Sequence, residues 1–118
     1  MKNNQPITQV EKHIAESDTL ISTTDLKGVI TSVNDNFTKV SEFTAEELVG
    51  ASHNIVRHPD MPSEAFSNLW ETLKAGKAWV GVVKNRSKGG DHYWVDAYIA
   101  PIVENGQNVG YQSVRMRA

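Results

Sequence analysis

The stretch WVGVVKNRSKGGDHYWVDAYIAPIVENGQNVGYQSVR, residues 79–115, decides the fold. Its residues alternate between apolar and polar over three runs, 79–86, 92–102 and 109–115. A period of two is typical of strands whose one face is buried, and the segments between the runs contain the glycines that tight hairpins favour. The stretch therefore predicts a three-stranded antiparallel meander.

Upstream of the meander, the spacing of the apolar residues is that of a helix and no longer has a period of two. Residues 63–75 place Phe66, Leu69, Trp70 and Leu73 on one face, and Gly76 ends the helix. Shorter helices are predicted at 34–43 and 44–50, the latter from a capping box in which Thr44 is the cap and Glu47 reaches back. Two further strands, 19–24 and 29–33, form a hairpin at Gly28. These elements predict an α+β domain with an antiparallel sheet and short helices on one face.

Length and composition limit the possible functions. The 118 residues support one core, so we expect an N-terminal cap or arm at 1–18, as a short helix or a loosely held segment, and one domain at 19–118. The absence of cysteine excludes disulfides, thiol nucleophiles and photochemistry that needs a cysteine adduct. A net charge of −2 argues against binding to nucleic acid or anionic membranes. With no signal peptide and no apolar run long enough to span a bilayer, we expect a soluble, cytoplasmic chain.

The meander also suggests a cavity. The first strand places Trp79, Gly81, Val83 and Asn85 on its uncharged, inward face. Small residues with a side-chain amide leave room for a flat polar ring, and Gln112 on the last strand offers a second amide. A filled core with amides at the surface is the alternative.

The segment 51–62 contains the polar side chains His53, Arg57, His58 and Asp60 between prolines. A rigid loop of this composition can present a cation and polar rings to an anionic ligand. A histidine–carboxylate metal site and a plain surface loop are alternatives, and the spacing does not match that of zinc hydrolases, so no metal is expected. No nucleophile or acid–base pair with an enzyme's spacing occurs, so we expect no catalytic residue and no enzyme.

Residues 19–115 resemble a PAS domain. The segment Arg57-His58-Pro59-Asp60-Met61-Pro62, together with 69–77 and 83–86, is similar to the sensor domain of bacterial aerotaxis receptors. The resemblance implies a PAS fold with a five-stranded antiparallel sheet, non-covalently bound FAD, and a redox sensor that signals to chemotaxis modules. It also implies HAMP and chemoreceptor-type segments outside this chain, and anchoring of the full-length receptor in the inner membrane.

The resemblance implies a set of flavin-binding positions. Similarity to aerotaxis receptors indicates Asn34, Arg57, His58, Asp60 and Trp79, and similarity to light-oxygen-voltage domains indicates His53, Asn85 and Gln112. His53 falls where the light sensors carry their reactive cysteine, and Val95 replaces a second ring-binding Asn. The ring is expected over Gly81 and Ala97, with Gln112 changing its hydrogen bond on reduction and moving the last strand. Two alternatives remain: a heme-binding oxygen sensor with His53 or His58 as ligand, and a cofactor-free module that forms a homodimer.

Overall fold

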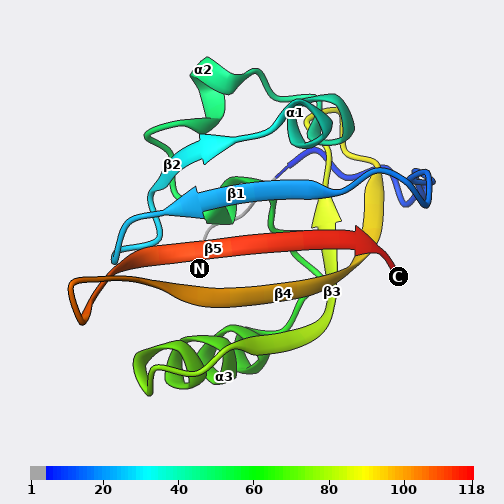
Figure 1. Cartoon of the computed structure of the whole chain (residues 1–118). Helices are drawn as coiled ribbons and strands as arrows, with labels where there is room; N and C mark the ends of the chain where they lie inside the picture. Colours follow the sequence, from blue (N-terminus) through cyan, green and yellow to red (C-terminus); the bar gives the residue numbers. More distant parts are fainter. Residues whose placement is uncertain (1–4) are drawn as a thin grey trace.

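The computed structural model describes residues 5–118 and has one sheet with helices on one of its faces (Figure 1). Its five strands are antiparallel and lie in the order β2-β1-β5-β4-β3. The elements in chain order are β1 (Leu20–Thr24), β2 (Ile30–Val33), α1 (Asp35–Ser41), α2 (Ala45–Leu48), the 3-10 helix η1 (His53–Val56), α3 (Ser63–Lys74), β3 (Trp79–Arg86), β4 (His92–Glu104) and β5 (Gln107–Arg117). The predicted α+β fold and its five-stranded sheet are confirmed.

The β4–β5 hairpin is the longest paired region and extends beyond the predicted strands. Asn105 and Gly106 turn the chain with φ angles of 51° and 77°. Two successive positive φ angles are the conformation of a type I′ turn, whose twist matches that of the flanking strands. The turn therefore allows pairing to continue to Glu104 and Gln107.

The helices begin where the sequence supplies caps. The Asn34 side chain accepts a hydrogen bond from the backbone N–H of Phe37 at the start of α1. Thr44 and Glu47 form the predicted capping box of α2. In Figure 1, α1 and α2 lie near β1 and β2, whereas α3 leads directly into β3.

The core lies between these helices and the inward face of the sheet. On β4, the side chains of Tyr93, Val95, Ala97 and Ile99 are buried, while the residues between them are exposed. Val95 is wholly buried, so the position at which the light sensors carry Asn is part of the apolar core here. The alternation along β4 thus separates a buried face from an exposed one.

The N-terminal segment is extended and lies against the first residue of β4. The backbone N–H of Lys12 donates to the carbonyl of His92 at 2.6 Å, and the N–H of His92 donates to the carbonyl of Val10 at 2.9 Å. Ile14 is buried in the core. A short helix or an arm is expected for residues 1–18. Residues 5–18 form an arm and contain no helix, and residues 1–4 lie outside the described region.

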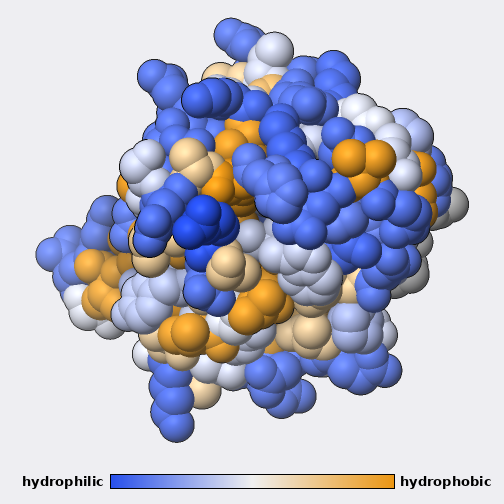
Figure 2. Space-filling view, turned by 90° about the vertical axis from the view of Figure 1, so that its right-hand side faces the viewer, coloured by the Kyte–Doolittle hydropathy of each residue, from blue (hydrophilic) through white to orange (hydrophobic). Residues whose placement is uncertain are grey.

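The surface is mostly polar where Figure 2 shows it, and hydrophobic side chains emerge there in separate groups. Within residues 5–118, no helix is long and apolar enough to cross a membrane.

Candidate functional site

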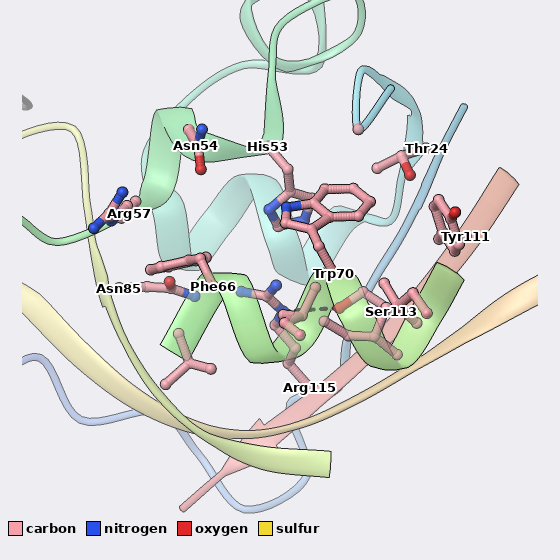
Figure 3. A pocket seen from close by; sticks show the side chains of 15 residues that line it. Thr24, His53, Asn54, Arg57, Phe66, Trp70, Asn85, Tyr111, Ser113 and Arg115 are labelled. Atoms are coloured by element: carbon pink, nitrogen blue, oxygen red, sulfur yellow. Dashed lines mark hydrogen bonds between the residues drawn. The ribbon is translucent and has the colours of Figure 1, made fainter. Parts of the chain in front are cut away.

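A cavity of about 70 Å³ lies between the sheet and the segments that cover it (Figure 3). Its walls are mostly apolar. Helix α3 contributes Phe66, Leu69, Trp70 and Leu73, and the η1 region contributes His53, Asn54 and Arg57. The volume corresponds to several water molecules, because one water needs roughly 10–15 Å³ on this measure.

The floor of the cavity is formed by the three strands of the predicted meander. β3 contributes Val83 and Asn85, β4 contributes Ile99, and β5 contributes Tyr111, Ser113 and Arg115. The inward orientation predicted for Asn85 is confirmed, since its side chain is buried and lines the cavity. Ser113 and Arg115 are not among the predicted positions, although alternation from an inward Tyr111 indicates both.

Arg115 is the most unusual group of the floor. Its side chain is 6 % exposed, and its Nε donates to Ser113 Oγ at 2.8 Å. With the Asn85 amide oriented so that both of its ends find partners, Oδ1 accepts from Arg115 Nη1 at 2.7 Å and Nδ2 donates to the carbonyl of Val56 at 3.3 Å. Burial lowers the pKa of Arg115 to about 10. The guanidinium therefore remains charged at neutral pH.

His53 faces the same cavity from the opposite wall. Its Nε2 lies 3.0 Å from Ser22 Oγ on β1, and its ring meets that of Phe37 edge to face. Burial, followed by the charge of Arg115, lowers the pKa of His53 to about 3. His53 is consequently neutral at physiological pH.

Arg57 lies at one end of the cavity. Its backbone forms a β-bridge with Asn85, which fixes the η1 region against β3. Its guanidinium stacks 4.2 Å from the centre of the Phe66 ring and donates to the carbonyl of Met61 at 2.9 Å. Arg57 thus supplies a second positive charge to the lining.

His58 and Asp60 do not line the cavity. His58 is fully buried with its ring edge to face against His92, and its Nδ1 accepts from the backbone N–H of Asp60 at 3.0 Å. Burial lowers the pKa of His58, whereas the hydrogen bond from Lys84 lowers that of Asp60. Among residues 5–118, no three His, Cys, Asp or Glu side chains gather where they could hold a metal ion.

Trp79 lies outside the cavity lining and fills the space that Gly81 leaves. Its indole Nε1–H donates to Asn68 Oδ1 at 3.0 Å, which joins β3 to α3. A Cβ added at Gly81 would overlap the Trp79 ring. The room expected at Gly81 is therefore filled by Trp79, and neither Gly81 nor Ala97 lines the cavity. The position of a ligand ring over these two residues stays a prediction.

Asn34 also lies outside the lining, and its side chain joins the start of α1 to β1. Besides capping Phe37, its Oδ1 accepts from the N–H of Ile21 at 3.1 Å and its Nδ2 donates to the carbonyl of Thr19 at 2.8 Å. These three bonds give Asn34 a structural role.

The prediction that Gln112 faces the cavity is wrong. Gln112 is exposed, while its neighbours Tyr111 and Ser113 are buried and line the cavity. Since successive residues of a strand point to opposite faces, the three cannot share one side. The amide nearest the cavity on the meander is that of Asn85.

Comparison with known proteins identifies the fold family. The PAS-fold family matches residues 30–115. This chain belongs to the PAS family. The PAS domain is 24 % identical to that of a protein from Colwellia psychrerythraea, with a TM-score of 0.77 over 85 % of this chain and 86 % of the other. A light-oxygen-voltage domain structure concerned with a flavin analogue gives a TM-score of 0.79 at 19 % identity, over 86 % and 78 % of the two chains.

Curated relatives are larger signalling proteins. The PAS domain is 52 % identical over its full length to the aerotaxis receptor of Escherichia coli, and covers 23 % of that receptor. It is 26 % identical over 90 residues to a nitrogen fixation regulatory protein of Klebsiella pneumoniae, which corresponds to 76 % of this chain and 18 % of the relative. This chain therefore spans less than a quarter of the length of these two relatives.

Proposed function

We propose that this PAS domain binds FAD and serves as the redox-sensing domain of an aerotaxis receptor. One observation carries the proposal. The cavity combines apolar walls with a floor that holds an amide and a guanidinium, and none of its described lining residues is an Asp or Glu. The 52 % identity to the Escherichia coli aerotaxis receptor supports the assignment to that class of receptor.

The residues of the cavity fit the chemistry of a flavin. An isoalloxazine ring is apolar on its faces and polar along its pyrimidine edge, and Asn85 offers both a donor and an acceptor to such an edge. Arg57, at one end of the lining, suits the phosphates of the ligand. His53, being neutral, can hydrogen-bond without adding charge. When bound, the flavin would supply the capacity to accept and release electrons.

Not all of the positions implied by the resemblance need touch the ligand. Asn34, His58, Asp60 and Trp79 lie outside the lining, and each makes hydrogen bonds that fix a neighbouring element. We assign them a supporting role, in which they position the η1 region, α1 and α3 around the ligand. Their substitution would then weaken flavin binding indirectly.

The size of the cavity requires a side chain to move. A three-ring heterocycle is larger than a cavity of about 70 Å³. Trp70 lines this cavity and also an outer hollow formed with Leu26, Lys27 and Lys74, so it separates the cavity from the surface. Its ring contacts Tyr111 edge to face at 5.5 Å and lies against Gly28. Movement of Trp70 toward the outer hollow would open the space for the ring.

A signal can leave the site through β5. This strand carries Tyr111, Ser113 and Arg115 into the cavity, and its end lies near the N-terminal arm, where Arg117 is 3.7 Å from Glu16. A change of charge beside Arg115 would therefore act on the strand that leads to the C-terminus. In the receptor we propose, HAMP and chemoreceptor-type segments outside this chain receive the signal from a homodimer, with the sensor in the cytoplasm and the full-length protein anchored in the inner membrane.

The absorption spectrum of the purified protein, supplied with FAD, tests the proposal. We expect bound flavin with maxima in the blue and near ultraviolet, and a melting temperature that rises with FAD concentration. A Soret band would instead indicate heme, and a colourless protein that FAD does not stabilise would indicate a cofactor-free module. Competition with FMN, which lacks the adenylate part of FAD, tests whether that part contributes to the binding affinity.

A matched pair of variants locates the site. Asn85→Leu removes the amide from the cavity and should weaken flavin binding strongly. Gln112→Leu makes the same chemical change on the opposite face of the sheet and should leave binding intact. Equal loss in both variants would contradict the proposed site.

A further inference from the structure

We propose that Arg115 makes this cavity bind the reduced, anionic form of the flavin more tightly than the oxidised form, and so sets the redox potential at which the sensor responds. The inference rests on the proposed function. It assigns to one residue a property that neither the fold nor the resemblance defines.

The hydrogen-bond partners of Arg115 are neutral groups. Its Nε donates to Ser113 Oγ, and its Nη1 donates to the amide oxygen of Asn85. Tyr93 and the neutral His53 are the titratable groups that interact with it electrostatically. In the described part of the chain, Arg115 is in no ion pair, and the side chains lining the cavity include no carboxylate.

A buried cation without a counter-charge is costly. Transfer of a charge from water to the protein interior costs several kcal/mol per ion, and hydrogen bonds to neutral groups offset only part of it. The usual result would be an Arg that turns toward solvent. Arg115 instead points into the cavity, beside Ser113 and toward Asn85 (Figure 3). A ligand that brings a negative charge into the cavity would offset the cost.

A flavin acquires that charge when it is reduced. The oxidised ring is neutral, and uptake of two electrons and one proton, the proton at N5, leaves one negative charge on the ring. The electrons come from an external reductant, which is dithionite in the experiment below. In a low-dielectric cavity, the attraction between this charge and Arg115 is much stronger than in water. Because this attraction exists only in the reduced state, the attraction raises the affinity of the cavity for the reduced flavin alone.

The experiment measures the midpoint potential of FAD bound to the full chain, in the wild type and in Arg115→Gln, Arg115→Lys and Arg117→Gln. Arg115→Gln removes the buried charge and should lower the ratio of reduced to oxidised affinity at least tenfold, which is about 30 mV for a two-electron couple. Arg115→Lys keeps the positive charge, so its midpoint potential should stay close to that of the wild type. Arg117→Gln removes a half-exposed charge two residues further along β5 and should shift the potential little.

A second readout needs no variant. The wild-type protein with reduced FAD should keep the ring anionic to a pH well below that at which free reduced FAD takes up its second proton, and the absorption spectrum distinguishes the two forms. Reduced flavin that is bound in the neutral form at pH 7 would overturn the inference, even if Arg115→Gln fails to fold. The inference would also be overturned if the midpoint potential of Arg115→Gln were unchanged, or if that of Arg115→Lys fell as far as that of Arg115→Gln. A wild type that binds no flavin would instead overturn the proposed function itself.

Discussion

Arg115 Nη1 lies 2.7 Å from the amide oxygen of Asn85, so a buried cation on β5 is held by a neutral group on β3, two strands away in the sheet. The bond crosses above β4, where Val95, Ala97 and Ile99 form the apolar core. The same Asn85 also donates to the carbonyl of Val56 in η1. Asn85 therefore connects the floor of the cavity to one of its walls.

Asn85→Ala should destabilise the domain even without a ligand. The change leaves the guanidinium of Arg115 and the carbonyl of Val56 without these partners, and a hydrogen bond to a charged group contributes about 1.5–3 kcal/mol. We expect the free energy of unfolding, measured by urea denaturation, to fall by about 2–3 kcal/mol. Gln112→Ala, on the exposed face of β5, is the control and should change it by less than about 0.5 kcal/mol. A similar change in the free energy of unfolding in both variants would show that the hydrogen bonds of Asn85 contribute little to stability.

Asn34→Ala should lower stability by about 2–3 kcal/mol, because it removes a helix cap worth about 1 kcal/mol and two further bonds of similar size, to Ile21 and Thr19. Thr44→Ala removes the cap of α2 alone and should cost about 1 kcal/mol. Thermal and urea unfolding of the flavin-free protein check the difference. Equal losses, with an additional loss of flavin binding only in Asn34→Ala, would instead indicate that Asn34 contacts the ligand.

Gly110→Ala should be more destabilising than Gly81→Ala. A methyl group at Gly110 would overlap the backbone carbonyl of Thr24, which is fixed in the pairing of β1 with β5. A methyl group at Gly81 would overlap the Trp79 ring, a side chain that can shift at the cost of its hydrogen bond to Asn68. Overpacking costs about 1–3 kcal/mol, so we expect about 3 kcal/mol or more at Gly110 and about 1 kcal/mol at Gly81 by urea denaturation. The opposite order would mean that β1 shifts more easily than Trp79.

The strands and caps could be predicted from the sequence because their signals are local. Alternation identified β3 with the bounds that the structure shows, and the Thr44–Glu47 pair identified the start of α2. Asn85 was placed correctly for the same reason. The position of α3 followed from the spacing of its apolar residues and from Gly76.

The errors concern properties that local pattern does not determine. The amide of Gln112 and its match to light-oxygen-voltage domains favour an inward position, but the alternation of β5 turns it outward, because Tyr111, Ser113 and the charged Arg115 are the buried residues. The room expected at Gly81 is filled by Trp79, and a side-chain rotamer cannot be read from spacing. His58 does not line the cavity, and its ring packs against that of His92, a contact between distant parts of the chain that local pattern does not reveal.

Acid should destabilise the domain through the partly buried His53 and the buried His58 well before carboxylates are protonated. His53 has a pKa of about 3 in the folded state against an ordinary value of 6.5, so below pH 6.5 the unfolded chain binds a proton that the folded chain does not. Stability is therefore fully present above pH 6.5 and is lost as pH falls toward 3. For His53 alone, the free energy of unfolding should fall by about 1.4 kcal/mol between pH 8 and pH 5.5. His58, whose pKa is also lowered, should add to this loss.

Urea denaturation at pH 8 and pH 5.5 measures this dependence, and His53→Gln isolates one contribution. The variant replaces the imidazole by a side chain that does not titrate, so the difference in stability between the two pH values should shrink by about 1.4 kcal/mol, whatever the substitution costs at pH 8. His13→Gln is the control for the loss of a histidine elsewhere on the chain, because the His13 side chain is 84 % exposed. An unchanged pH dependence in His53→Gln would mean that His53 becomes protonated in the folded protein near its ordinary pKa, which would require water to reach it beside Ser22.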